Sequence, residues 1–218
     1  MKAYFNLFLF VSLFISTQIN GMRGHRNYEA QDLLGNTLLH DALIENQPAK
    51  YILAILALGP RATQLQNIHG FAPLLLAIMQ GYNTRTIFTL LTHNPGAVET
   101  PNNAGNTPLY EALVHNHPDQ VLFLLLSYGA NPNQGLRVDL APHLIERYTQ
   151  FLLNNPWLKN RHGVFVADLI ENPGLRARIE QERYLKLVEK TTIDPERHFL
   201  AIPEEWNEQL RRLLRAGL

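Results

Sequence analysis

The residues best suited to chemistry in this 218-residue chain are its nine histidines, because the sequence contains no cysteine. The absence of cysteine excludes disulfides, thiolate zinc sites and cysteine nucleophiles. The closest pair of potential metal ligands is His115 and His117, which flank Asn116. We expect this short stretch to be a polar loop between two helices, so we predict no metal site and no cofactor.

Catalytic motifs are also missing from the sequence. It contains no G-x-S-x-G turn, no phosphate-binding G-x-x-x-x-G-K and no H-E-x-x-H. An enzyme would need a nucleophile and a base that converge, and the candidates in the C-terminal third are His143, His162, Asp168 and His198. Their spacing supports no such site, so we predict no enzyme and no catalytic residues.

Four carboxylates lie farther towards the N-terminus without an evident partner, and we expect them to be solvated. They are Asp41, Glu45, Glu111 and Asp119.

The clearest pattern in the sequence is a phrase that returns every 35 residues. It occupies 35–43, 70–78 and 105–113, and the third copy reads Gly-Asn-Thr-Pro-Leu-Tyr-Glu-Ala-Leu. A fixed period of this length indicates stacked supersecondary units, each made of two helices. The repeat favours binding over catalysis, because such an array presents a surface.

Each unit can be interpreted in the same way. A glycine at 35, 70 or 105 suits a turn with positive φ. Thr37 or Thr107 then suits a helix N-cap, and Pro73 or Pro108 suits the first helical position. We interpret His40 as a structural residue that satisfies backbone groups of its own turn and of the next. The second helices are expected to end at residues that tolerate the left-handed conformation, namely Gly59, Asn94 and Gly129.

These units resemble ankyrin repeats over about 32–134. Residues 107–112, Thr-Pro-Leu-Tyr-Glu-Ala, are similar to the family phrase T-P-L-H-x-A, and His40 matches its histidine. The chain departs from the phrase at Leu38, where proline is usual, and at Ala72, where threonine is usual. The resemblance implies an all-α ankyrin-repeat solenoid of stacked helix-turn-helix units, with repeats at 32–66, 67–101 and 102–134.

Beyond the third unit the phase breaks, and we predict degenerate ankyrin-like repeats and a helical cap over 135–190. Residues 138–155 are interpreted as a compressed fourth unit, and 160–163 are similar to the turn at 102–105. Residues 166–170 resemble a worn first helix, and a charged helix from about Pro173 supplies the polar outer face that a terminal unit needs. A C-terminal helix is expected within 191–218, beginning near Pro203.

The N-terminus has the pattern of a secretory signal peptide, residues 1–21, with Lys2 before an apolar run from Ala3 to Ile15. We therefore expect an exported protein, secreted or periplasmic, with no membrane contact once the signal is removed. An uncleaved signal that anchors the chain in the membrane is the alternative. The net charge of zero gives no reason to expect a nucleic-acid partner.

In ankyrin-like proteins the residues at the turn tips and on the exposed side of the first helix bind partners, and the resemblance implies such a surface here. The partner-binding candidates are Leu33, Leu34, Ile44, Glu45, Ile68, His69, Phe71, Met79, Gln80, Asn103 and His115. Several are apolar, and Phe71 with Met79 is the expected hot spot. Coverage of this patch by 22–31 or by the C-terminal helix is the competing interpretation.

Three functions remain open at this point. The first is a protein–protein interaction module without catalysis, acting as a secreted effector or as a periplasmic binding protein. The second is a self-associating scaffold that forms homo-oligomers through the apolar patch. The third is an enzyme that uses the C-terminal third.

Overall fold

The computed structural model describes residues 27–193. The expected signal peptide and the expected helix near Pro203 lie outside the described residues. The chain divides into two compact units, of which the first ends at Asn106 and the second begins at Thr107. This boundary falls inside the third expected repeat, 102–134.

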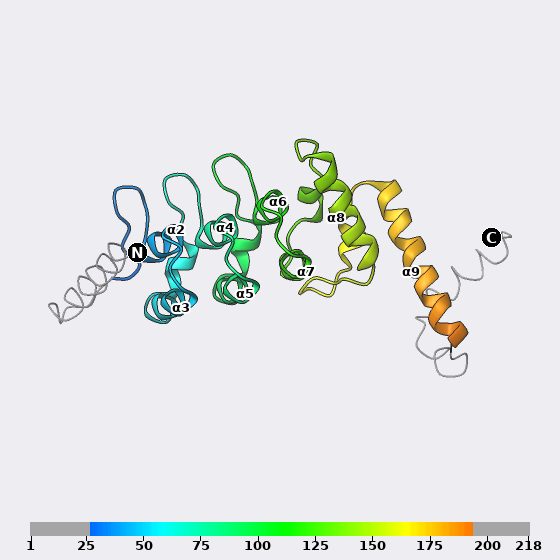
Figure 1. The fold of residues 1–218 in the computed structure, drawn as a ribbon, viewed down its shortest axis with the longest axis horizontal. Coiled ribbons are helices and arrows are strands. Elements are labelled where there is room, and N and C mark those ends of the chain that lie inside the picture. The colour runs from blue at the N-terminus through cyan, green and yellow to red at the C-terminus, as the bar shows by residue number, and fades with distance from the viewer. Residues whose placement is uncertain (1–26, 194–218) are drawn as a thin grey trace, which may run out of the picture. The chain divides into compact units, whose positions relative to one another are not determined.

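The first unit consists of two helix pairs, each followed by a short 3-10 helix. Figure 1 shows α2 and α4 side by side in one layer and α3 and α5 side by side in a second layer. The elements in chain order are α2 (Leu38–Ile44), α3 (Ala49–Leu58), η1 (Pro60–Gln64), α4 (Pro73–Met79), α5 (Thr84–His93) and η2 (Pro95–Glu99).

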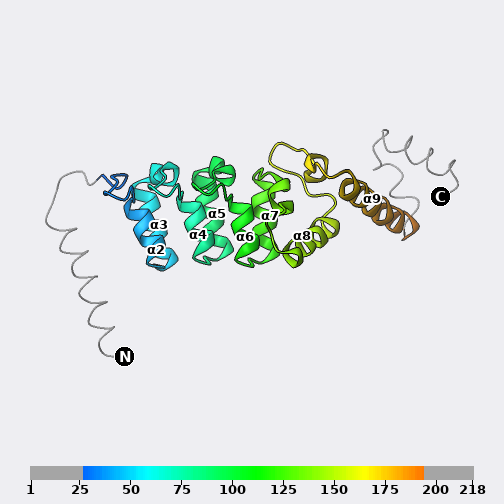
Figure 2. The same ribbon diagram turned by 90° about the horizontal axis from the view of Figure 1, so that it is seen from above.

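The second unit begins with a third helix pair and then changes its pattern. Its elements are α6 (Pro108–Val114), α7 (Asp119–Ser127), η3 (Pro132–Leu136), α8 (Pro142–Asn154), η4 (Val166–Leu169) and α9 (Pro173–Ile193). In Figure 2, α8 and α9 follow the pair α6 and α7; they contact each other, but η4 separates them in the chain, so no short loop joins them as in the earlier pairs. Residues 138–155 thus contain one helix, and the expected worn helix at 166–170 is a single 3-10 turn.

The predicted all-α repeat architecture is confirmed. Between residues 27 and 193 the regular structure is helical, apart from one isolated bridge between Lys159 and Phe165. The expected glycines also adopt positive φ, with values of 71° at Gly35, 77° at Gly70 and 79° at Gly105.

The predicted helix starts are confirmed as well. The hydroxyl of Thr37 accepts from the backbone N–H of His40, and that of Thr107 accepts from the N–H of Tyr110. Pro73 and Pro108 occupy the first position of α4 and α6, where a missing N–H costs nothing.

His40 has the structural role that the sequence predicts. Its side chain is completely buried, and its Nδ1 accepts from the Thr37 N–H at 3.1 Å. Its Nε2 donates to the carbonyl oxygen of Phe71 in the next repeat, 67–101, at 3.0 Å. The two contacts require a neutral ring with the proton on Nε2. Burial lowers the pKa of His40, which is consistent with that neutral form.

The second helices end where the sequence predicts, at Gly59, at Asn94 and just before Gly129, but only one of these residues is left-handed. Gly129 has a φ of 103°, but φ is −147° at Gly59 and −140° at Asn94. Gly59 is small for another reason, because a Cβ there would lie 2.7 Å from the Cβ of Tyr28. Asn94 instead donates its side-chain amide to the carbonyl of Thr63 at 2.9 Å.

Three further left-handed residues follow the first helices. Asn46 and Asn116 each have a φ of 52°, and Gly81 has a φ of 72°. These residues end α2, α6 and α4, because the left-handed conformation lets the following backbone N–H groups reach the last carbonyls of each helix.

The segment after each second helix is a short 3-10 helix. Each turn starts with proline, at Pro60, Pro95 or Pro132, whose fixed φ suits a first helical position. The fourth residue of each turn is buried: Thr63, Val98 and Gly135. The third turn holds glycine there because the ring of Tyr148 fills the space, and a Cβ on Gly135 would lie 2.3 Å from that ring.

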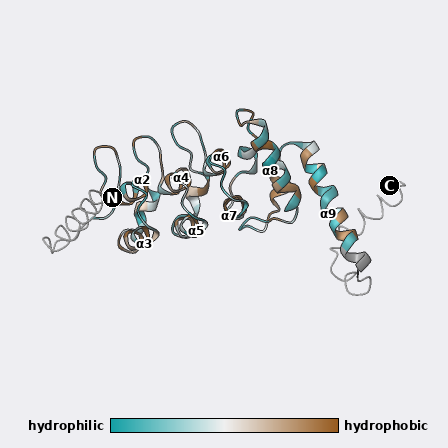
Figure 3. Cartoon of the chain, viewed as in Figure 1, coloured by the Kyte–Doolittle hydropathy of each residue, from teal (hydrophilic) through white to brown (hydrophobic). Residues whose placement is uncertain are grey.

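Arg183 is a buried charged residue of the second unit. It lies on α9, which alternates hydrophilic and hydrophobic turns in Figure 3, and only 2% of its surface is exposed. Its guanidinium lies 4.2 Å from the ring centroid of Phe165 and 5.7 Å from that of Trp157. It donates to the carbonyl of Pro156 and pairs with Asp168 at 3.6 Å. Desolvation lowers its pKa, but the ion pair and the two rings hold it between α9 and the loop after α8.

Replacing His40 is expected to remove a pH-dependent part of the stability. Because the folded-state pKa is lowered, the unfolded chain binds more protons at this residue when the pH falls below its ordinary pKa of 6.5. The contribution of His40 is therefore complete above that value and declines below it. Leu75 stands at the corresponding position of the second repeat, 67–101, so His40→Leu is the natural variant. We expect a loss of about 2 kcal/mol near neutral pH and a smaller loss near pH 5. Urea unfolding of the wild type and the variant at both pH values measures this difference in the free energy of unfolding. An equal loss at both would contradict the assignment.

Gly135→Ala is expected to destabilise the second unit, because the added methyl group collides with the buried ring of Tyr148. The free energy of unfolding should fall by about 1–3 kcal/mol, as for other overpacked sites. Gly96→Ala is the control, since its new Cβ would have its nearest neighbour at 3.5 Å. Chemical unfolding followed by circular dichroism compares the two variants. Equal stabilities would show that the ring of Tyr148 can move aside at no energetic cost.

Candidate functional site

Three loops of the first unit, 32–36, 67–71 and 102–106, share one closed geometry. In each loop the first side chain, Asp32, Asn67 or Asn102, accepts two backbone N–H groups through its Oδ1. The backbone N–H of the same residue donates to the carbonyl at the end of the loop, at 2.9–3.2 Å. These bonds satisfy the turn from within and leave its second and third residues at the tip.

The three loops are also joined to one another. The N–H of Ile68 donates to the carbonyl of Leu34 at 3.0 Å, and that of Asn103 donates to the carbonyl of His69 at 3.2 Å. The side chain of Asn103 adds a bond to the carbonyl of Ile68 at 2.9 Å. Figure 1 shows the loops projecting in parallel from one side of this unit. The tips therefore form a continuous row with a fixed backbone.

The side chains of two glutamines, Gln31 and Gln66, also connect neighbouring loops. The amide of Gln31 donates to the carbonyls of Gly35 and Gln66, at 2.6 and 2.9 Å. The amide of Gln66 repeats this arrangement one unit later with Gly70 and Pro101, at 2.7 and 3.1 Å. Each glutamine thus ties its own loop to the start of the next.

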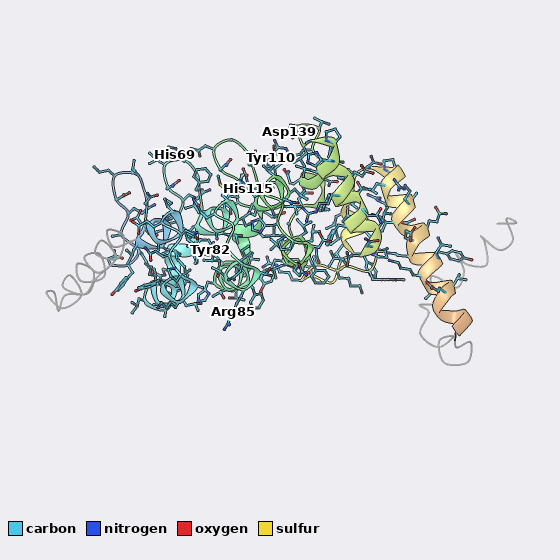
Figure 4. All side chains as sticks on the ribbon, in the orientation of Figure 1. His69, Tyr82, Arg85, Tyr110, His115 and Asp139 are labelled. Carbon is cyan, nitrogen blue, oxygen red and sulfur yellow. The ribbon has the colours of Figure 1, made fainter. Side chains whose placement is uncertain are left out.

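The structure leaves the tip side chains in solvent. Leu33 is fully exposed, and Leu34 and Ile68 are 51% and 54% exposed. His69, labelled in Figure 4 on the second loop, is exposed beside Phe71, with the two ring centroids 6.3 Å apart. We call Leu33, Leu34, Ile68, His69 and Asn103 the tip surface.

Other candidates lie at the ends of the first helices. Ile44 and Glu45 at the end of α2 and Gln80 after α4 are exposed. Phe71 and Met79, the hot spot expected from the sequence, are half-buried. Phe71 is drawn inward because its backbone carbonyl and N–H are both held, by His40 and by Asn67. Leu38 is exposed at the start of α2 and was not predicted as a binding residue. In the other two repeats this position holds a buried proline.

His115 belongs to the second unit and has a local partner. Its Nε2 lies 3.4 Å from Glu111, one helical turn earlier on α6. The expectation that Glu111 is solvated is wrong, because its residue is buried with 5% of its surface exposed. Asp119, by contrast, is exposed and pairs with Arg147 at 3.1 Å.

A cluster in the second unit had not been predicted. Arg137 pairs with Asp139 at 2.6 Å and lies 4.4 Å from the ring centroid of Tyr110, and Figure 4 labels Tyr110 and Asp139. The hydrogen bond from Arg137 lowers the pKa of Asp139. The spacing of Arg137 and Asp139 was the available signal, but only the fold brings Tyr110 to them.

The repeats now have both a sequence period and a matching geometry. Residues 39–135 match the family model for ankyrin repeats in three copies. This protein contains ankyrin repeats. No curated protein is significantly similar to the chain. Ankyrin repeats are protein–protein interaction modules and are typically non-catalytic.

The described residues, 27–193, contain no group of three or more histidine or acidic side chains that could hold a metal ion. The proposed catalytic group is dispersed: His143 and His162 are exposed, Asp168 pairs with Arg183, and His198 lies outside the described residues. No helix in this range has the length and apolar character needed to cross a bilayer.

A fourth turn, 160–164, repeats the loop geometry in the second unit. Asn160 accepts the N–H groups of His162 and Val164 through its Oδ1, and Gly163 has a φ of 78°. The echo seen in the sequence at 160–163 is therefore a real turn. Its Arg161 N–H donates to the carbonyl of Ser127 at the end of α7, so this turn closes the third helix pair of the chain.

Substituting Asn67 tests whether the cap fixes the tips. Asn67→Ala removes two accepted N–H bonds and a 3.0 Å bond from its amide to Asn36, with an expected loss of about 1–3 kcal/mol. Asn67→Asp should lose less, because Asp32 fills this role in the first loop. Amide hydrogen exchange at His69 and Phe71 should accelerate in the alanine variant. Unchanged exchange at these two residues would mean that the hydrogen bonds between neighbouring loops are enough to hold this loop.

Proposed function

We propose that this protein binds another protein through the tip surface, the adjoining exposed residues of α2, and Gln80 at the end of α4. The observation that carries the proposal is the combination of exposed aliphatic side chains with a locked backbone. A surface that is already ordered loses little conformational entropy on binding, so its apolar contacts contribute fully to affinity.

The chemistry of the tip surface indicates the kind of partner. Leu33, Leu34 and Ile68 are aliphatic, and the only acidic residue of the first loop, Asp32, is engaged in its turn. A partner segment with apolar side chains would bury these three residues, while Asn103 and His69 supply polar contacts at the edge. No strongly charged partner is required.

The described part of the N-terminal tail supports an open tip surface. Tyr28 lies against Gly59 at the end of α3, and Gln31 lies behind the first loop. Residues 27–31 therefore pack elsewhere. Export remains part of the proposal and rests on the signal-like pattern of 1–21. The exported protein would act as a secreted effector or as a periplasmic binding protein.

The double variant Leu34→Ser, Ile68→Ser is expected to weaken partner binding at least about tenfold, because both side chains lie at the centre of the row. Partners captured on the wild-type protein would be identified by mass spectrometry, and their affinity measured by calorimetry. The matched control is Leu53→Ser, Leu58→Ser on α3, whose side chains are 43% and 59% exposed. If the control lost binding and the tip variant retained it, the partner would bind the α3 side.

Self-association is the second candidate, since the same apolar row could face a second copy. Sedimentation velocity over a range of protein concentrations distinguishes the two functions. A concentration-dependent dimer that the tip variant abolishes would favour the scaffold, and a monomer throughout would favour a separate partner.

A further inference from the structure

The second unit contains an open groove of about 560 Å³ beside the last turns of α9. Its walls come from α7, from the loop that follows α8, and from α9. The lining residues that matter here are Phe123, Pro156, Trp157, Lys159, Lys186 and Glu189. None of these residues takes part in the tip surface.

The groove has an aromatic floor and cationic edges. Phe123 and Trp157 are 47% and 39% exposed, which leaves two large rings in contact with water. The ammonium group of Lys159 lies 4.3 Å from the ring centroid of Phe165, and that of Lys186 donates to the carbonyl of Asn154 at 3.0 Å. Both lysines are therefore held at fixed positions beside the rings.

The chain leaves the described region next to this groove. Glu189 lines the groove, and α9 ends at Ile193, one turn later. From Ile193 to Trp206 there are 13 residues, which span at most about 40 Å when extended. The sequence beyond α9 is therefore long enough to return to the groove.

The sequence of that segment complements the groove. Within the helix expected from about Pro203, apolar residues recur at helical spacing, at Trp206, Leu210 and Leu213. Three carboxylates, Glu204, Glu205 and Glu208, are interspersed with them and match the two lysines in charge. Three arginines follow, at 211, 212 and 215, and can face the single acidic residue of the wall, Glu189.

We propose that residues 199–216 of the same chain dock in this groove, with Trp206 and Leu210 against Phe123 and Trp157. The glutamates of the segment then face Lys159 and Lys186. An attached segment has an effective concentration in the millimolar range, so it outcompetes a second copy at ordinary protein concentrations. The inference is independent of the proposed function, and it gives the second unit a built-in cover while the tip surface stays available.

Because the chain has no cysteine, a single introduced pair tests the docking directly. The full chain carrying Phe123→Cys and Leu210→Cys would be treated with a short bifunctional thiol reagent, and its products separated by gel electrophoresis. Phe88→Cys with Leu210→Cys is the matched control, since Phe88 occupies the same position on α5 and is also 47% exposed. We expect the Phe123 pair to cross-link within one chain at least about tenfold faster than the control.

Charge reversal adds a second readout. Lys159→Glu should slow the cross-link several-fold, and adding Glu204→Lys and Glu205→Lys should restore its rate. Lys50→Glu is the control, because Lys50 also lies over an aromatic ring, that of Tyr51 at 5.5 Å. Equal rates for the Phe123 and Phe88 pairs would overturn the proposal, as would a product linked only between two chains.

Discussion

The first unit depends on a single local constraint, the closure of each loop by the side chain that begins it. Asp32, Asn67 and Asn102 accept the N–H groups that a turn otherwise leaves to water, and a glycine with positive φ completes each turn. The closed turn sets the point at which the next first helix starts. Without it, the N-caps of α2 and α4 would have no fixed position.

Hydrogen bonds between neighbouring repeats add to this constraint. His40 donates to Phe71, Gln31 to Gln66, and Ile68 to Leu34, so each loop is bonded to the one after it. Such bonds link only adjacent units, and in this kind of array stability is approximately a sum over units and their interfaces. The surface used for binding and the bonds that hold the array together therefore share the same loops.

Residues whose role is local could be predicted from the sequence. The turn glycines, the Thr37 and Thr107 caps and His40 all act within a few residues or at a fixed period, and the structure confirms them. Roles set by distant contacts could not be predicted. Gly59 is small because of Tyr28, and Gly135 because of Tyr148.

The candidate site divides in the same way. The tip residues follow from the period, and their exposure agrees with that expectation at Leu33, Leu34 and Ile68. The inward position of Phe71 and the burial of Glu111 depend on partners that no local pattern reveals. Arg183 was predicted as part of a solvated helix face, but two aromatic rings from another loop bury it.

The attachment of the fourth turn has a consequence for how the array can change in length during evolution. Residues 160–171 are held by the carbonyl of Ser127 and by both polar atoms of the Asn133 side chain, which bond to Leu169 and Glu171. Each second helix ends in a backbone carbonyl that corresponds to that of Ser127. At the position of Asn133, however, the earlier 3-10 turns have Arg61 and Gly96. A tandem duplication of the third unit would carry its own attachment point, whereas deletion of that unit would leave the C-terminal part without one. The third repeat can therefore be duplicated more easily than it can be lost.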